Sequence, residues 1–175
     1  MLRLPFRFFR AFLVTGLCFL FLLGAFWSCE KDDICVDGDT ALLVLRFFDN
    51  ASPETSKAVT RLRVIGLGQD APVNTFADRS NRDSIALPLR PGEPETTFIL
   101  IFNSQDGEGG ETGNADTVRF NYQTREVFIS RACGFVAQYD ELGAEVQTGD
   151  GNWIQSVEVV NPTVQTLQPH VFVFH

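Results

Sequence analysis

The stretch Thr96-Thr-Phe-Ile-Leu-Ile-Phe-Asn103 contains five consecutive apolar residues, preceded by two threonines and followed by an asparagine. A short apolar run of this kind can bury both of its faces, which predicts a central β-strand. Before it, Ile85, Leu87 and Leu89 share one face of an alternating segment. Pro88 lies on the opposite face and indicates an edge strand, because proline has no backbone N–H to donate. The centre of the chain therefore predicts a β-sheet.

Short β-branched and aromatic segments recur between turn residues along the rest of the chain, without a helical period. We expect strands at Thr40–Phe48, Ala58–Leu67, Ser84–Leu89, Thr96–Asn103, Thr117–Tyr122, Arg125–Tyr139, Asn152–Val160 and His170–His175. The expected loops are Asn50–Ser56, Asp70–Asn81, Arg90–Glu95, Gln105–Ala115 and Asp140–Gly151. A hairpin is expected over Val118–Ile129 with Gln123-Thr124 as its turn, and Arg125–Tyr139 is expected to bend at Gly134. The pattern predicts an all-β, antiparallel β-sandwich of about eight strands, immunoglobulin- or transthyretin-like in class.

The first 28 of the 175 residues differ in composition from the remainder. They contain Arg3, Arg7 and Arg10, no acidic residue, and the apolar run Ala11–Ala25. A basic start and an apolar run of about 15 residues are typical of a secretory signal peptide, whereas a membrane-spanning helix needs about 20 apolar residues. We expect 1–28 to be a signal peptide, 29–38 a tether and 39–175 the β-sandwich domain. An uncleaved signal anchor is the alternative.

The apolar region stops at Cys29, in the sequence Phe26-Trp27-Ser28-Cys29. This resembles a lipobox, in which a small residue precedes a cysteine that becomes acylated, although Phe26 and Trp27 are bulkier than the usual residues. Each buried methylene of an acyl chain contributes about 0.8 kcal/mol, so two or three chains anchor a protein firmly. The alternative is an ordinary signal peptide that is cut nearby.

Lys31, Asp32 and Asp33 follow the cysteine. A lysine and two acids at this place resemble the surface-export signal of lipoproteins in Bacteroidetes-type bacteria; a flexible polar tether is the alternative. We therefore expect a protein anchored by lipid in the outer membrane, on the cell surface or on the periplasmic face.

Net charge argues against two classes of partner. The signal peptide takes three of the 14 basic residues, so 11 basic residues face 22 acidic ones, a net charge of −11. Nucleic-acid binding requires a basic surface to meet the phosphates, so nucleic acid is excluded as a partner. For the same reason an anionic membrane surface is not expected to attract the domain electrostatically. The acidic surface is expected to keep the domain soluble.

Cys35 and Cys133 would both lie in an oxidising compartment, where spare thiols usually form disulfides. A bond between them would close a loop of about 100 residues. The alternative is that Cys133 acts as a nucleophile, which requires a base, and only His170 and His175 are candidates. These histidines lie five residues apart and would face opposite sides of a strand, so they cannot jointly bind one metal.

Other motifs do not favour a catalytic or metal site. The acidic segment 106–116 suggests a calcium loop, but glutamate and threonine occupy the places where the EF-hand requires glycine and glutamate. We expect a mobile acidic hairpin loop instead, and no cofactor. Trp153 could stack on a sugar, although packing in the core is the stronger expectation. Paired carboxylates for glycoside hydrolysis cannot be identified from sequence.

With these residues described, the chain resembles an uncharacterised family of small Bacteroidetes lipoproteins. The matching segments are Lys31–Cys35, Arg46–Asp49, Ile85–Leu89, Phe120–Tyr122, Ile129–Phe135, Trp153-Ile154 and His170–Phe174. The resemblance implies an outer-membrane-associated lipoprotein that acts with an outer-membrane β-barrel, and it supports the pairing of Cys35 with Cys133. We expect a non-catalytic envelope module that binds or supports a membrane protein or a glycan. A carboxylate-based hydrolase of envelope glycans and a purely structural module are the alternatives.

Overall fold

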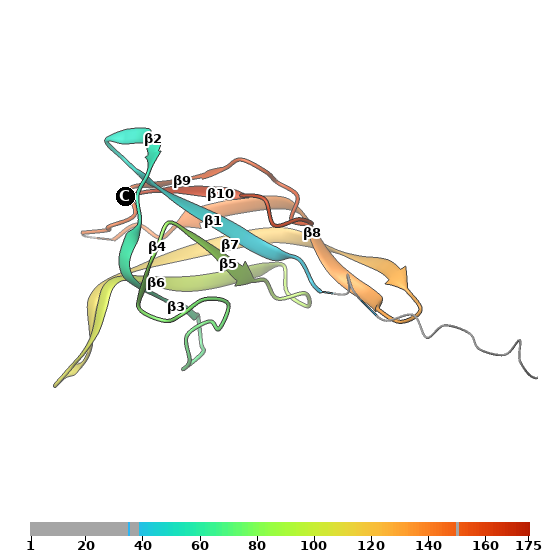
Figure 1. Cartoon of the computed structure of the whole chain (residues 1–175), viewed down its shortest axis with the longest axis horizontal. Helices are drawn as coiled ribbons and strands as arrows, with labels where there is room; N and C mark the ends of the chain where they lie inside the picture. The colour runs from blue at the N-terminus through green and yellow to red at the C-terminus, as the bar shows by residue number, and fades with distance from the viewer. Residues whose placement is uncertain (1–34, 36–38, 150) are drawn as a thin grey trace, which may run out of the picture. The chain divides into compact units, whose positions relative to one another are not determined.

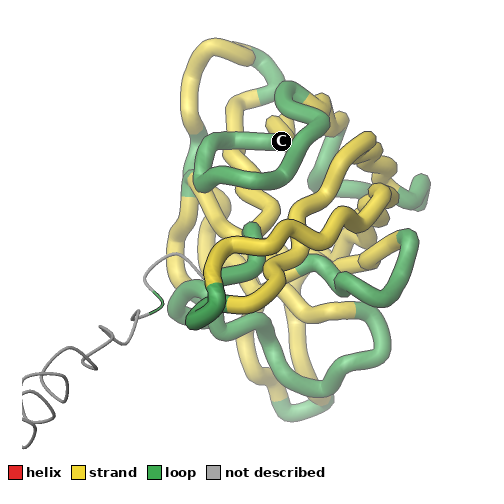
Figure 2. Tube along the Cα trace, turned by 90° about the vertical axis from the view of Figure 1, so that its right-hand side faces the viewer, coloured by secondary structure: helices red, strands yellow, loops and turns green. Residues whose placement is uncertain are grey.

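The computed structural model describes Cys35, residues 39–149 and residues 151–175. The predicted signal peptide, the acylation site Cys29 and the export signal Lys31, Asp32 and Asp33 lie outside the described residues. The described part folds as one compact unit within Cys35–His175. It consists of strands joined by loops, with no helix in the described ranges (Figure 2).

Ten strands form two sheets in this part of the chain (Figure 1). Their bounds are β1 (Leu42–Asp49), β2 (Ser52–Ser56), β3 (Val59–Gly66), β4 (Ser80–Arg82), β5 (Ser84–Pro88), β6 (Glu95–Gly107), β7 (Gly110–Ser130), β8 (Gly134–Val146), β9 (Ser156–Val159) and β10 (Val171–Phe174). The first sheet has the order β2-β1-β10-β9, and β5 also pairs with β1. The second sheet has the order β4-β3-β6-β7-β8. The predicted all-β, sandwich-like architecture is therefore confirmed.

Two details of that architecture differ from the prediction. β1 and β10 pair in parallel, from Leu45 opposite Val171 to Phe48 opposite Phe174, so the first sheet is mixed rather than antiparallel. Alternation of apolar and polar residues does not encode strand direction, which explains the error. The short strands β2 and β4 also raise the number of strands above eight. All five residues of β2 are exposed, so no buried apolar face marked it within its predicted loop.

The predicted hairpin turn at Gln123-Thr124 is wrong, because both residues lie within β7, a continuous strand of 21 residues. The pairing with β8 shifts register between Asn121 and Gln123, so the interruption in the pattern is a bulge. Gln-Thr lacks the glycine or asparagine that tight hairpin turns favour. The real turns bear such residues, with Gly110 at φ 113° as the first residue of β7 and Gly134 at φ 70° as the first residue of β8.

Segment boundaries around these turns change accordingly. The predicted strand Arg125–Tyr139 is divided between β7 and β8 by a turn before Gly134. The predicted loop Gln105–Ala115 is mostly a paired ribbon, with Gln105 opposite Thr112. The predicted loop Asp140–Gly151 starts later, because β8 continues to Val146. Polar and acidic side chains suggested loops here, yet the backbone pairs while those side chains face solvent.

The core lies between the two sheets and follows the alternation in sequence. Phe98, Leu100 and Ile101 are buried, and β6 lies between β3 and β7, as expected for a central strand. β5 pairs only with β1 and is an edge strand, as Pro88 predicted. Core side chains that the alternation placed on one face are indeed buried: Leu62, Val64, Ile85, Leu87, Leu89, Val118, Phe120 and Tyr122.

The two sheets are connected along both long edges. On one side the chain passes from β4 to β5 through Asp83, whose carbonyl accepts a hydrogen bond from the Phe47 N–H. On the other side Tyr139 of β8 pairs with Val164 in the loop before β10. Burial raises the pKa of Tyr139 to about 12, and its hydroxyl donates to the Leu89 carbonyl across the core. A pocket lies beside this second edge, at the end of β8.

Candidate functional site

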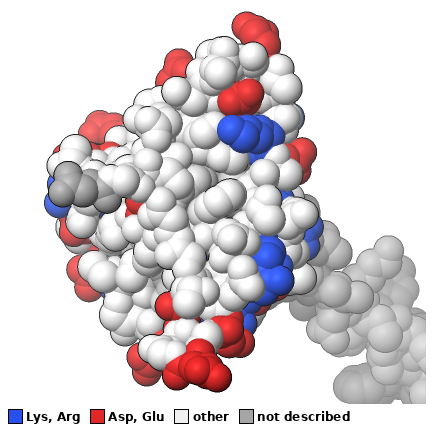
Figure 3. Space-filling view, turned by 90° about the vertical axis from the view of Figure 1, so that its left-hand side faces the viewer, with Lys and Arg blue, Asp and Glu red and all other residues white. Residues whose placement is uncertain are grey.

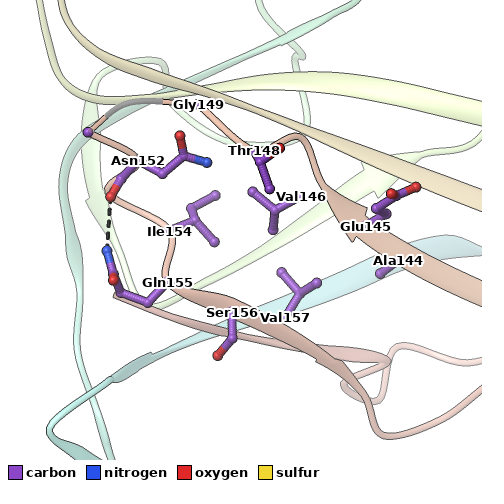
Figure 4. A pocket seen from close by; sticks show the side chains of 11 residues that line it. Ala144, Glu145, Val146, Thr148, Gly149, Asn152, Ile154, Gln155, Ser156 and Val157 are labelled. Atoms are coloured by element: carbon purple, nitrogen blue, oxygen red, sulfur yellow. Dashed lines mark hydrogen bonds between the residues drawn. The ribbon is translucent and has the colours of Figure 1, made fainter.

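A pocket of about 630 Å³ opens where the end of β8 faces β9 and the loop between them (Figure 4). This volume lies within the range of small-molecule sites, which is about 300–1,000 Å³. The residues that line it come from the end of β8, from the loop and from β9: Ala144, Glu145, Val146, Thr148, Gly149, Gly151, Asn152, Ile154, Gln155, Ser156 and Val157. The pocket is therefore built by one continuous part of the chain.

Buried Asp116 of β7 fixes the position of Ile154, one of the residues that line this pocket. Its carboxylate accepts the Ile154 N–H at 2.7 Å, and only 4 % of Asp116 is exposed. Burial raises the pKa of Asp116, while the backbone N–H groups of Ile154 and Trp153 act in the opposite direction. The Asp116 carboxylate therefore accepts the hydrogen bond that a neighbouring β-strand would otherwise accept from the loop.

Amide side chains fix the rest of the loop. Asn114 Nδ2 donates to the Gly151 carbonyl at 2.8 Å, and Asn152 Nδ2 donates to the Gln147 carbonyl at 2.9 Å. Gln155 Nε2 donates to the Asn152 carbonyl at 2.9 Å, the bond that is dashed in Figure 4. The pocket is thus held open by hydrogen bonds within the loop and to the neighbouring β7.

The lining offers polar contacts with little net charge. Thr148 and Ser156 present hydroxyl groups, and Val146 and Val157 present apolar surface (Figure 4). Glu145 is the one carboxylate among the described lining residues, and it forms an ion pair with Arg119. No histidine, cysteine or lysine lines the pocket in the described part of the chain. Such a surface suits an uncharged ligand that has several hydroxyl groups.

Trp153 packs inward beside the pocket. Its ring lies 5.8 Å from that of Phe102 and 6.4 Å from that of Phe47, and its Nε1 donates to the Leu100 carbonyl. The expected core packing is therefore confirmed, and the indole does not offer its face to a ligand.

Cys35 and Cys133 form a disulfide with their Cα atoms 4.9 Å apart, so the predicted pairing is confirmed. A sulfur in a disulfide is not a thiolate, and the alternative of Cys133 as a nucleophile is wrong for this state. Cys133 lies in the turn between β7 and β8. The bond therefore attaches the start of the domain to the end of that hairpin.

The two histidines flank β10 and do not form a joint site. His170 is fully buried, and its Nδ1 accepts the Val44 N–H at 3.0 Å. His175 instead packs edge-on against Trp153, with ring centroids 5.5 Å apart. Burial lowers the pKa of both histidines. His170 serves as a backbone partner in the core, a role that the sequence did not indicate.

The acidic segment 106–116 binds arginines instead of presenting its carboxylates together. Asp106 accepts two hydrogen bonds from Arg79, at 2.6 and 2.9 Å, and Glu111 lies 3.4 Å from Arg63 Nε. The described residues contain no group of three or more acidic, histidine or cysteine side chains arranged around a common point. The expected mobile loop is instead a paired ribbon closed by ion pairs.

Three residues with positive φ surround buried Ser104 at the base of this ribbon. They are Arg61 at 45°, Arg79 at 52° and Asn103 at 53°. Arg61 Nε donates to the Ser104 carbonyl and Arg79 Nε to the Ser104 hydroxyl. This cluster could not be predicted from the sequence, because arginine is not a typical residue for left-handed backbone. Each arginine here has its partners within the protein, so the cluster stabilises the bulged strands.

An apolar cluster is exposed at the end of the β7–β8 hairpin. Phe128 is 55 % exposed, Ile129 38 % and Phe135 67 %. The two phenylalanines are uncovered next to the disulfide turn.

A family model of a family of unknown function, DUF6452, matches residues 61–175. The chain belongs to this family. The DUF6452 match begins within β3 and includes the pocket, the β7–β8 hairpin and Cys133, whereas β1, β2 and Cys35 precede it. The sequence-based expectation of an uncharacterised family is confirmed at this level.

No curated protein and no solved structure matches this DUF6452 chain. Within the described ranges, no helix has the length and hydropathy that crossing a bilayer requires. The pocket, the disulfide and the exposed hairpin end are the distinctive parts of the DUF6452 chain.

Proposed function

We propose that this DUF6452 protein is a lipid-anchored protein of the bacterial outer membrane whose β-sandwich domain binds a partner without catalysis. The Cys35–Cys133 disulfide is the observation that carries the proposal. Such bonds persist in exported proteins and are rare in the cytosol. Together with the basic and apolar segment 1–28, the bond supports export, cleavage before Cys29 and acylation of that cysteine. Lys31, Asp32 and Asp33 would then direct the protein to the cell surface.

The pocket supports a binding role, with an envelope glycan as the ligand. Its hydroxyl and amide groups can exchange hydrogen bonds with sugar hydroxyls, and Val146 and Val157 can contact the apolar face of a sugar ring. Glycoside hydrolysis instead uses two carboxyl groups about 5–10 Å apart. Glu145 alone, paired with Arg119, does not provide that arrangement among the described lining residues. The exposed apolar hairpin end favours a domain that makes a contact through this surface over a purely structural module.

The anchor is tested by the variant Cys29→Ala in producing cells. We expect the variant to leave the membrane fraction, because the acyl chains are lost with the thiol. Cys18→Ala is the matched control, since Cys18 belongs to the segment that is removed. If Cys29→Ala and Cys18→Ala fractionate identically with membranes, the anchor proposal is wrong.

The pocket is tested by binding to an array of bacterial envelope glycans. Ser156→Tyr should fill the pocket and abolish binding, whereas Thr166→Tyr adds the same side chain at an exposed position outside it. Equal binding by both variants would contradict a glycan site in this pocket. Release of new reducing ends from a bound glycan would contradict the non-catalytic role. Crosslinking in intact cells would identify an outer-membrane β-barrel partner.

The finer fold class is part of the proposal. We infer an immunoglobulin- or transthyretin-like sandwich from the two facing sheets and the short connections between strands. An experimental structure with a strand order foreign to both classes would contradict this assignment.

A further inference from the structure

The end of the β7–β8 hairpin presents a pair of aromatic side chains to solvent. Phe128 and Phe135 lie directly opposite each other in the register, and their ring centroids are 5.3 Å apart. Each is more than half exposed, at 55 % and 67 %. Exposed aromatic pairs at the end of a hairpin are costly in water and indicate that something covers them.

The pair is exposed because the hairpin extends beyond the core. On the same face of β8, Tyr139 and Ala137 are buried, and the Ala41 N–H donates to the Ala137 carbonyl at the start of β1. Phe135 lies two residues further out, where no strand of the described part covers it. Figure 1 shows the hairpin extending past the start of β1. The inner face of the second sheet therefore continues outward as an uncovered apolar surface.

The disulfide brings this surface close to the proposed lipid. Cys133 lies in the hairpin turn and is bonded to Cys35, which follows Cys29 by six residues. Six extended residues span at most about 20 Å. Without the bond the first attachment would be Ala41, twelve residues after Cys29, with a reach of about 40 Å. The bond thus keeps the aromatic pair within reach of the bilayer surface.

Charge distinguishes this end of β7 from the other. Residues 127–136 contain Arg131 and no acidic residue. The opposite hairpin, between β6 and β7, carries Asp106, Glu108 and Glu111. Acidic side chains also gather at the lower edge of the face shown in Figure 3. Because the protein is otherwise acidic, the β7–β8 end is the part that an anionic bilayer repels least.

We propose that the end of the β7–β8 hairpin inserts Phe128 and Phe135 into the interfacial layer of the bilayer that holds the lipid anchor. The proposal rests on the proposed function, because it requires acylation of Cys29. Aromatic side chains prefer the interfacial layer, and Arg131 can bind lipid phosphate. The hairpin is then a second attachment that fixes how the domain faces the membrane.

Tryptophan fluorescence in vesicles with brominated acyl chains tests this orientation. The acylated protein is produced from the full-length gene, purified from membranes and reconstituted into vesicles of phosphatidylethanolamine and phosphatidylglycerol. In Phe128→Trp we expect about half of the added emission to be quenched, because interfacial side chains lie about 5–10 Å deep. The wild type supplies the baseline, since its Trp153 packs on the core.

Leu67→Trp is the matched control. Leu67 is 51 % exposed, and its N–H donates to Thr97, which pairs with Arg119. Arg119 precedes Phe128 by nine residues on β7, about 30 Å at the rise of a strand. We expect no quenching at this position. Phe135→Trp serves as a second probe of the hairpin end if Phe128→Trp fails to fold.

The outcomes separate the two proposals. Vesicle flotation with quenching at position 128 or 135 and not at 67 supports the insertion. Flotation with equal emission in plain and brominated vesicles for both hairpin variants overturns the insertion and leaves the lipid anchor intact; a protein partner would then be the cover. If the protein does not float with vesicles, the anchor and the insertion both fail.

Discussion

Opening the Cys35–Cys133 disulfide should remove a large part of the stability of the domain. The bond joins residues 98 apart in sequence. In the chain-entropy treatment, a loop of this length lowers the entropy of the unfolded chain by about 16 cal/mol/K, which corresponds to about 4.7 kcal/mol at 25 °C. Domains of this kind are stable by only about 5–15 kcal/mol. Reduction should therefore remove a third or more of the free energy of unfolding.

Urea unfolding of the purified protein, with and without a thiol reductant, measures this difference. With a slope of about 2 kcal/mol per molar urea, the midpoint should fall by about 2 M on reduction. Cys35→Ser with Cys133→Ser should reproduce the reduced protein in the absence of reductant. The near-ultraviolet circular dichroism of the folded protein should persist, because the bond lies outside the core. A shared midpoint for the oxidised and reduced forms would refute the entropic account.

Two further predictions concern buried ionisable groups. Burial lowers the pKa of His170 and His175 below 6.5, so the unfolded chain binds protons first as the pH falls. The stability that depends on the neutral rings is present above pH 6.5 and is lost below it, by at most about 1.4 kcal/mol per pH unit for each histidine. Urea titrations between about pH 8 and pH 5 measure this loss, and a free energy of unfolding that does not change with pH would contradict it. Asp116→Ala should lower the free energy of unfolding by about 1–3 kcal/mol, because it leaves the buried Ile154 N–H without its acceptor. Asp116→Asn keeps an acceptor and removes a buried charge, so it should cost less, and equal losses in both variants would show that the hydrogen bond does not hold the pocket loop.

Much of the core could be predicted from the sequence because alternation reports burial directly. The segment around Phe98 is a central strand, and Ile85 and Leu87 face the core as their spacing indicates. The same pattern does not report the exposure of Phe128 and Phe135, since alternation shows which face a side chain occupies and not whether another sheet covers that face. The prediction of an all-antiparallel arrangement was wrong for a related reason. The parallel pairing of β1 with β10 depends on contacts across most of the chain, which no local pattern contains.

The candidate site was less predictable than the core. The disulfide could be anticipated because few cysteines remained to choose from. The pocket could not be anticipated, because hydrogen bonds between side chains and the backbone shape it. One example is the bond from the Ile154 N–H in the loop to Asp116 of β7. In sequence these residues are one acid in a polar region and one apolar residue after a tryptophan. His170 is similar, since its role depends on the N–H of Val44, 126 residues away.

The parallel pair β1–β10 has a consequence for biogenesis. If the protein is exported as proposed, the chain emerges from its amino-terminal side, so β1 reaches the new compartment long before β10. Until residues 171–174 arrive, one backbone edge of β1 has no partner and is open to pairing with another chain. Under that proposal the domain cannot complete its first sheet while translocation is under way, and chaperones that shield unpaired strands would be needed in that interval.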